Sequence, residues 1–329
     1  MSLFAGQARA EESIRSGELE VAEYAPARNI HLLNGPLYFC YQLGFMDWLS
    51  EWNPDVLIVE SNPRYLTTPS AIKWMQGRGR PVIGWGLGAP HLSGPLASFR
   101  QKGWTRFINR FDALIAYSQR GADEYAAYGF PREKIFVAHN SVAPAPVTKP
   151  DTKAKMADQL AILFVGRLQA RKRIDSLLRA CAEMPGTPRL VIVGDGPERQ
   201  TLEQVAAKVY PSAEFVGVRY GSELKSYFAE ADLFVLPGTG GLAVQEAMSH
   251  GLPVIVAKGD GTQDDLVRAE NGWQIPPGDD NALVSTLRAA LSDVERLRKM
   301  GEESYRIVSQ EINLEKMVEF FIRALNSVL

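Results

Sequence analysis

The sequence predicts an α/β protein made of two doubly wound domains, each with a mostly parallel sheet. Three observations support this: a length of 329 residues, short apolar runs that alternate with helical patterns, and a proline-rich connector near the middle. A chain of this length exceeds one ordinary hydrophobic core. Strands that alternate with helices of about 10–15 residues indicate parallel βαβ units.

The alternation is clearest in the second half of the chain. The expected strands are residues 162–165, 190–193, 214–216, 233–236, 254–256 and 272–275, and the expected helices are residues 174–184, 198–209, 222–231, 242–250 and 282–291. The strands are almost wholly apolar, which is typical of a sheet covered by helices on both faces.

The first half follows the same pattern with weaker periodicity. Its expected strands are residues 56–59, 82–83, 113–117 and 135–138, and its expected helices are residues 37–52 and 68–78. Three prolines in residues 142–155 indicate a stiff connector. We therefore expect an N-terminal domain over residues 1–145, a hinge over 146–157, a C-terminal domain over 158–312, and a final helix over 313–329 that could pack back on the N-terminal domain.

Composition disfavours several classes of protein. The net charge of -2 argues against a general nucleic-acid binder, which needs a basic excess. Cys40 and Cys181 lie far apart, without metal-ligand spacing, so we expect no metal and a reducing, cytoplasmic compartment. The N-terminus has no signal-peptide pattern, and no apolar run approaches the roughly 18 residues that span a bilayer.

A candidate anion site follows the first strand of the second half. That strand ends at Gly166, and Arg167 and Lys172 come directly after it, before a helix. A strand end that leads into a helix N-terminus favours anions, and doubly wound sheets bind ligands at this edge. Arg171 and Arg173 add cations where helices prefer acids. The sequence thus predicts a diphosphate site, with solvated surface cations as the alternative.

A second candidate segment is a glycine-rich loop after residues 233–236. It could offer phosphate the backbone N–H groups of Gly240, Gly241, Leu242 and Ala243. Glu246 lies about one turn into the following helix, and its carboxylate could accept bonds from two neighbouring ribose hydroxyls. The alternative is an exposed helical glutamate beside glycines that serve only the turn.

Two further strand ends are weaker candidates. Asp195, in the sequence Gly-Asp-Gly-Pro, is more readily a turn residue than a ligand, because Pro197 suits a first helical turn. The backbone at Val216, where another strand ends, could pair with the edge of a nucleobase. An ordinary strand end is the alternative there.

Together these residues resemble the retaining nucleotide-sugar glycosyltransferases of glycosyltransferase family 4, which have the GT-B fold. The resemblance covers nearly all of residues 160–329 and, more faintly, residues 55–145. It is carried by Gly166-Arg167-Leu168 with Lys172, by Gly194-Asp195-Gly196-Pro197, by Phe215-Val216-Gly217, by the segment from Asp232 to Pro237, and by Glu246-Ala247-Met248 with Gly251 and Pro253. The resemblance implies two Rossmann-like domains that face a cleft.

The chain departs from the family pattern in two places. Gly238 stands where the family's Glu-x7-Glu motif has its first Glu, which the family associates with the transferred sugar. The family also opens with a strand and a glycine-rich loop, whereas residues 3–6 look like a later strand. We therefore expect the N-terminal domain to lack its first β-α unit.

The resemblance implies transfer of a sugar from a nucleoside-diphosphate sugar to a glycan or lipid-linked acceptor, with retention and without a cofactor or metal. Arg167 and Lys172 would stabilise the leaving diphosphate, Glu246 would hold the ribose, and His91 would line the acceptor side. A lone histidine is more often structural. An oxidoreductase would require Gly-x-Gly-x-x-Gly after a first strand, which is absent. A non-catalytic nucleotide-binding or partner protein of the same fold is the stronger alternative.

Residues 98–111 form a basic amphipathic segment. Lys102, Arg106 and Arg110 recur at every fourth position, and Trp104, Phe107, Ile108 and Phe111 occupy another face. Such a helix can lie on anionic lipid at the inner membrane face. We favour the alternative, in which the apolar face packs on the protein's own sheet.

Overall fold

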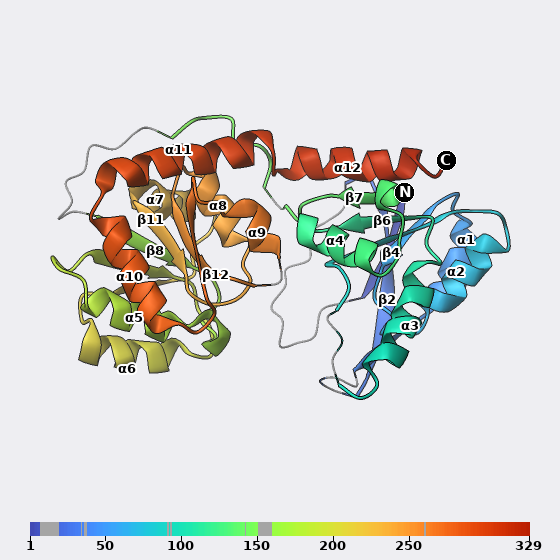
Figure 1. The fold of residues 1–329 in the computed structure, drawn as a ribbon, viewed down its shortest axis with the longest axis horizontal. Helices are drawn as coiled ribbons and strands as arrows, with labels where there is room; N and C mark the ends of the chain where they lie inside the picture. Colours follow the sequence, from blue (N-terminus) through green and yellow to red (C-terminus); the bar gives the residue numbers. More distant parts are fainter. Residues whose placement is uncertain are drawn as a thin grey trace. The chain divides into compact units, whose positions relative to one another are not determined.

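The computed structural model describes residues 1–6, 20–33, 35, 38–90, 92, 94–141, 143–150, 160–259 and 261–329. The chain divides into two units (Figure 1). Unit 1 comprises Met1–Ala138 together with Phe320–Leu329, and unit 2 comprises His139–Glu319. Both units are α/β with parallel sheets, as the sequence predicted. The predicted hinge falls partly outside the described residues.

Unit 2 is built on a six-stranded, wholly parallel sheet. Its strand order is β10-β9-β8-β11-β12-β13. The strands are β8 (Ala161–Val165), β9 (Arg189–Val193), β10 (Glu214–Gly217), β11 (Leu233–Leu236), β12 (Val254–Ala257) and β13 (Gly272–Ile275). The chain runs outward from β8 to β10 and then returns to place β11 beside β8. The loops after β8 and β11 therefore meet at the point where the strand order reverses, which is where such sheets bind ligands.

Helices cover both faces of this sheet. They are α5 (Ile174–Ala182), α6 (Arg199–Val209), α7 (Gly221–Glu230), α8 (Ala243–Ser249), α9 (Thr262–Leu266), α10 (Asp280–Leu291) and α11 (Val294–Gln310), with a 3₁₀ turn, η4, at Ala170–Lys172. Helix α5 packs against α6 and α10, and α8 packs against α11. Ile162, Phe164, Phe234 and Val254 of the central strands are fully buried, as expected for a sheet covered on both sides.

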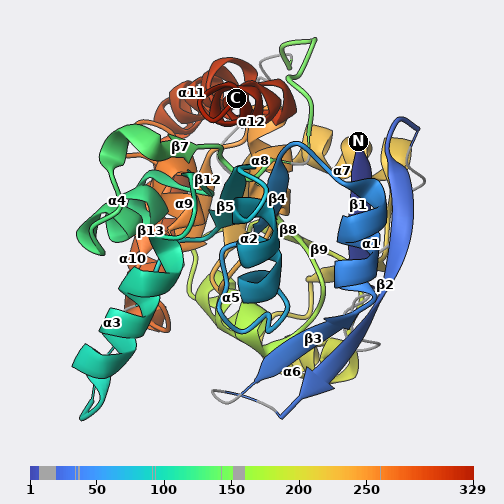
Figure 2. The same cartoon turned by 90° about the vertical axis from the view of Figure 1, so that its right-hand side faces the viewer.

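Unit 1 contains two separate sheets (Figure 2). In the first, β1 (Ser2–Gly6) lies parallel to β2 (Glu23–Leu32), which pairs antiparallel with β3 (Phe39–Leu43). The second is parallel and contains β4 (Leu57–Glu60), β5 (Val82–Gly86), β6 (Ala113–Ala116) and β7 (Ile135–Val137) in that order. Among the described residues no strand pairing joins β1 to β4.

Helix α1 (Phe45–Trp52) links the two sheets of unit 1 through apolar contacts. Phe4 of β1 lies 5.3 Å from the Phe45 ring and 5.2 Å from the Trp48 ring, measured between centroids. Leu49 belongs to the same cluster as Leu57 of β4. The predicted helix over residues 37–52 was wrong in its first part, because residues 39–43 pair with β2 and bury Cys40.

The other helices of unit 1 are α2 (Thr68–Gln76), α3 (Ala97–Ile108) and α4 (Gln119–Ala127), with a 3₁₀ turn, η2, at Arg132–Lys134. The last helix, α12 (Leu314–Asn326), ends in unit 1. There Phe321 packs edge-on against Trp85, with ring centroids 5.1 Å apart, and Ala324 is fully buried. Within the described part of the chain, no helix combines the length and apolarity needed to cross a bilayer.

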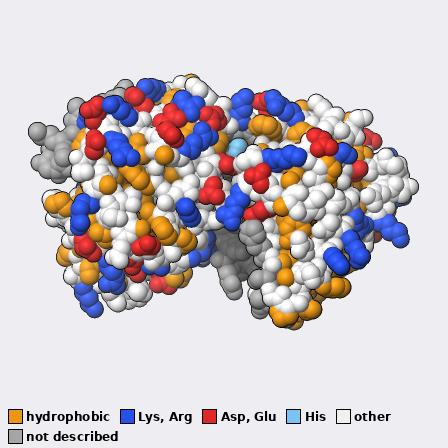
Figure 3. All heavy atoms as spheres, viewed as in Figure 1, with side chains coloured by type: hydrophobic (Ala, Val, Ile, Leu, Met, Phe, Trp, Pro, Cys, Tyr) orange, Lys and Arg blue, Asp and Glu red, His pale blue; other side chains and the backbone are white. Residues whose placement is uncertain are grey.

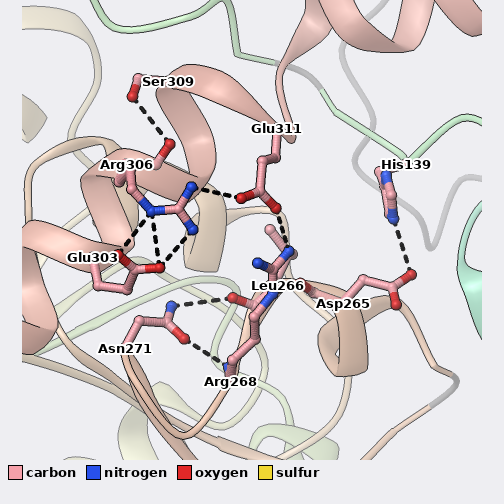
Figure 4. A network of polar contacts seen from close by, with 9 residues as sticks. All are labelled: His139, Asp265, Leu266, Arg268, Asn271, Glu303, Arg306, Ser309 and Glu311. Carbon is pink, nitrogen blue, oxygen red and sulfur yellow. Dashed lines mark hydrogen bonds and ion pairs between the residues drawn. The ribbon is translucent and has the colours of Figure 1, made fainter.

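A polar network fixes the C-terminal end of α11 (Figure 4). The Arg306 guanidinium donates to Glu303 at 2.6 Å and to Glu311 at 2.7 Å, and Arg268 donates to the other oxygen of Glu311 at 2.6 Å. Asn271 accepts from the Arg268 backbone N–H at 2.6 Å. The network ties α11 to the segment between α9 and β13, which positions the edge of the sheet.

Candidate functional site

The site begins where two glycine turns interlock at the carboxyl edge of β8 and β9. Leu168 N–H donates to the Asp195 carbonyl at 2.9 Å. A Cβ on Gly194 would lie 2.0 Å from the carbonyl oxygen of Gly166, and a Cβ on Gly196 would lie 2.3 Å from that of Leu168. No side chain fits at either position. These contacts fix the backbone that carries Arg167, which lies at this edge, half-buried.

Lys172 joins this edge to the loop after β11. Its side chain is only 5% exposed, and its ammonium donates to the Thr239 carbonyl at 2.8 Å and to the Gly240 carbonyl. Burial, and secondarily the neighbouring Arg171, lowers the pKa of the ammonium to about 8. A buried cation held by two neutral carbonyls gains much more from an anionic partner than a solvated one does.

The loop after β11 packs closely on the loop that carries Lys172. Thr239 N–H donates to the Arg171 carbonyl at 3.1 Å. A Cβ on Gly238 would lie 2.1 Å from that carbonyl oxygen and 2.5 Å from the Lys172 Cα. No side chain, and in particular no carboxylate, can occupy position 238 unless the backbone moves. Gly240 adopts a left-handed conformation with φ of 67°, which brings its carbonyl to Lys172.

The flanking arginines differ in what they contact. Arg173 is left-handed, with φ of 52°, and its guanidinium donates to Asp280 at 2.9 Å and to Ser176 at 3.0 Å. The charge of Arg173 is therefore compensated by Asp280 within the protein. Arg171 instead reaches the glycine loop, where its guanidinium donates to the Thr239 carbonyl at 3.2 Å.

The two weaker candidates have structural contacts. The Asp195 carboxylate accepts from Gly196 N–H at 2.7 Å and pairs with Arg199 at 3.3 Å. Val216 is half-buried and packs against the core, which leaves its backbone as the candidate contact for a base. Gly217 carries the chain out of β10 with φ of 74°, and its carbonyl accepts from Gly194 N–H at 2.8 Å.

Glu246 lies on an open cavity of about 970 Å³ within unit 2. Leu242, which directly precedes α8, and Lys225 of α7 line this cavity, and so do the connector at residues 143–150 and the side of α11. Burial raises the pKa of the Glu246 carboxyl, and Lys225 opposes the rise. A partly desolvated carboxylate beside a cation can accept hydroxyl donors.

The structure thus brings Lys172, Gly240 and Gly241 together, and Gly166 and Arg167 lie at the same edge of the sheet. Leu242 is 47% exposed and lines the cavity with Glu246, whereas Ala243 packs against the core. His91 lies outside the described residues.

Sequence reasoning missed two residues. Thr239 acts only through its backbone, which leaves no sequence signal. Gln245 is 2% exposed and donates to Ser141 at 2.6 Å and to the Ile312 carbonyl at 2.8 Å. The sequence signal for Gln245 was its amide side chain among apolar neighbours in α8. Within the described part of the chain, no group of three or more His, Cys, Asp or Glu side chains could hold a metal ion.

Comparison with known proteins identifies the family. The sequence profile described as "Glycosyl transferases group 1" matches residues 148–307, and the profile described as "Glycosyltransferase Family 4" matches residues 4–145. The chain belongs to the family 4 glycosyltransferases.

Curated relatives carry several activities in their names. The chain is 34% identical over 193 residues to a GDP-mannose-dependent alpha-mannosyltransferase of Mycobacterium tuberculosis, an alignment that covers 56% of this chain and 50% of that protein. It is 34% identical to the sulfoquinovosyl transferase SQD2 of Arabidopsis thaliana over 43% of this chain and 28% of the relative. It is 23% identical to the lipopolysaccharide core glycosyltransferase LpsE of Rhizobium meliloti, over 79% of this chain and 80% of that protein. The chain thus spans half or less of the length of the first two relatives.

Solved structures show the same fold. Anabaena Alr3699/HepE in complex with UDP superimposes with a TM-score of 0.66 at 20% identity, over 86% of this chain and 81% of that one. The apo form of the lipopolysaccharide outer core galactosyltransferase WaaB gives a TM-score of 0.69 at 20% identity, over 94% of this chain and 85% of that chain. The fold is GT-B.

Proposed function

We propose that this protein is a retaining glycosyltransferase that moves a sugar from a nucleoside-diphosphate sugar to a glycan or lipid-linked acceptor. The observation that carries the proposal is the buried ammonium of Lys172, held between the loops after β8 and β11 where the strand order reverses. Relatives named as mannosyl, sulfoquinovosyl and lipopolysaccharide core transferases support this class of reaction.

In the proposed reaction, charge develops on the leaving diphosphate and is stabilised by groups already in place. Lys172 would exchange its two carbonyl acceptors for phosphate oxygens, and Arg167 would add a second cation from the same edge. The backbone N–H groups of residues 240–243 would complete the anion site. The reaction needs no metal in this proposal, because the two side chains supply the positive charge.

Glu246 would hold the ribose of the donor, in keeping with its half-buried carboxylate beside Lys225. Asp195 would support the site indirectly, because its carboxylate already orders the turn at Gly196. The backbone at Val216 remains a candidate for the base, and His91 a candidate for the acceptor side. A cytoplasmic location fits two cysteines that are both buried as thiols.

A second candidate function is that of a non-catalytic nucleotide-binding protein with the same fold. Position 238 favours it, because a side chain there would collide with the Arg171 and Lys172 backbone. No carboxylate from this position can assist the transferred sugar.

Release of nucleoside diphosphate from a panel of UDP-, GDP- and ADP-sugars separates the two functions. Turnover of one donor, lost in Arg167→Gln and Lys172→Met and kept in the exposed-site control Lys208→Met, supports the transferase. Binding of donors without turnover of any of them supports the second function. If none of the nucleotide sugars in the panel binds, the proposed site itself is refuted.

A further inference from the structure

Gln245 is an amide on the buried side of α8. Figure 3 shows charged side chains of both signs over the part of the surface that α11 forms in Figure 1. Helix α8 packs against α11, and its Gln245 is only 2% exposed, like its neighbours Val244 and Met248, which are fully buried. A leucine would fill nearly the same volume without burying a polar group, which is costly in an apolar environment. The amide at this position therefore indicates a role that packing alone does not provide.

The Gln245 amide contacts two segments that are far apart in the sequence. Its NH2 group donates to the Ser141 hydroxyl at 2.6 Å and to the Ile312 carbonyl at 2.8 Å. Because a backbone carbonyl can only accept, the bond to Ile312 fixes which end of the amide carries the nitrogen. Ser141 follows the end of unit 1 at Ala138, and Ile312 precedes the return to unit 1 at Phe320. One side chain thus holds both segments of unit 2 that lead to unit 1.

These two segments are also bonded to each other. Leu314 N–H donates to the Ala143 carbonyl at 3.0 Å, and Ala145 N–H donates to the Glu315 carboxylate at 2.8 Å. We call them the paired connectors, which comprise residues 139–141, 143–145 and 312–317. They form one hydrogen-bonded support, and Gln245 ties α8 to both of its members.

The side-chain oxygen of Gln245 has no hydrogen-bond partner among the described residues. An unpaired buried acceptor is destabilising, whereas an apolar replacement of the whole contact can be nearly neutral. Turning the amide over would set this oxygen against the Ile312 carbonyl, which is also an acceptor. The arrangement therefore keeps the two bonds to the paired connectors although the oxygen remains unsatisfied. This is a poor way to stabilise a core, and it favours a role in orienting α8.

We propose that Gln245 is a positioning residue, which orients α8, and with it Glu246, against the paired connectors. Neighbouring side chains leave a helix about 100° apart, so the Gln245 amide meets Ser141 and Ile312 while Glu246 lies on the cavity. A rotation of α8 that breaks the two amide bonds moves the Glu246 carboxylate as well. The inference rests on the proposed role of Glu246, which is to hold the donor ribose.

Selectivity for ribose measures this positioning. The affinities of UDP, GDP and ADP are compared with those of their 2′-deoxy counterparts by calorimetric titration of the full chain. The wild type should prefer the ribonucleotide of the base it binds by roughly tenfold, because a hydrogen bond to a charged group is lost in the deoxy form. Glu246→Ala should abolish this preference. Gln245→Leu should reduce it to about threefold or less, although Glu246 is still present.

Two further variants separate positioning from general destabilisation. Ser141→Ala removes one of the two acceptors without changing α8, so it should lower the preference about twofold. Combined with Gln245→Leu it should lower the preference no further than Gln245→Leu alone, because both changes break the same contact. Gln263→Leu is the matched control, because Gln263 on α9 is also 2% exposed. It makes the same chemical change elsewhere in unit 2 and should keep the wild-type preference.

The outcomes distinguish this inference from the proposed function. No ribose preference in the wild type would refute the role of Glu246 and the inference together. A preference that Glu246→Ala loses, and that Gln245→Leu and Ser141→Ala both keep in full, overturns the inference alone. Equal losses in Gln245→Leu and Gln263→Leu would show general loosening of unit 2 and also overturn it. If Gln245→Leu does not fold, Ser141→Ala decides the question by the same comparison.

Discussion

Proton uptake on nucleotide binding is a direct consequence of the buried Lys172. Its pKa of about 8 means that near pH 8 about half of the free protein carries a neutral amine at this position. A diphosphate against the nitrogen favours the ammonium and raises its pKa. Binding of UDP or GDP at pH 8 should therefore take up as much as about 0.5 proton per site.

Calorimetric titration in two buffers that differ in ionisation enthalpy measures this uptake. Lys172→Met removes the titrating group and fills a similar volume, so its uptake should vanish. Lys208→Met is the matched control, because Lys208 is exposed on α6 and should leave the uptake unchanged. Binding without proton uptake in the wild type, or equal uptake in Lys172→Met, would refute the reasoning.

The same group predicts a pH dependence of stability in the free protein. The folded-state pKa of about 8 lies below the ordinary value of 10.5, so between these two pH values the unfolded chain binds more protons than the folded one. The free energy of unfolding should therefore rise with pH across this window, by up to about 3 kcal/mol. Lys172→Met should lack the rise, as urea denaturation at several pH values would show.

Three further predictions concern the framework around the site. Gly238→Ala should lower the free energy of unfolding by about 1–3 kcal/mol in denaturant titrations, because its Cβ meets the Arg171 carbonyl. Gly103→Ala in α3 should raise it by up to about 1 kcal/mol, because its Cβ has no atom within 4 Å. Equal effects of the two substitutions would contradict this prediction. Hydrogen bonds from Arg306 lower the pKa of Glu303 and help to lower that of Glu311, so their stabilisation is present above pH 4.5 and is lost as the pH falls further. Acid unfolding followed by circular dichroism should therefore be less steep in Arg306→Gln, and unchanged steepness would argue against the network. Burial raises the pKa of the Cys181 thiol to about 12, so thiol reagents at pH 8 should label it only after unfolding; rapid labelling of the native protein would show that the site opens.

The sheet of unit 2 could be predicted nearly to the residue. Its strands are apolar runs bounded by glycine or polar residues, as in Val254–Ala257, where tertiary context adds little to the local signal. Strands β2 and β3 were missed because their exposed sheet leaves most side chains partly solvated. Pro26 within β2 also weakens the local strand signal. Their pairing is settled by the register between Ile30 and Tyr41, which the local sequence does not contain.

The contact between the loop that carries Lys172 and the glycine loop could also be predicted, because the strand order places both loops at one edge. What the side chains contact could not be predicted. Arg173 pairs with Asp280, which is 107 residues away, and Lys172 contacts backbone carbonyls that carry no sequence signature. Such partners emerge only after the sheet has assembled.

The central claim is that Arg167 and Lys172 hold a diphosphate at the carboxyl edge of the unit 2 sheet. The most direct test compares the affinity of a nucleoside diphosphate with that of its monophosphate in the wild type, Arg167→Gln and Lys172→Met. We predict that the diphosphate binds the wild type at least about tenfold more tightly, since one charge-assisted contact contributes roughly that much, and that this preference collapses in both variants. An equal preference in all three proteins would contradict the account.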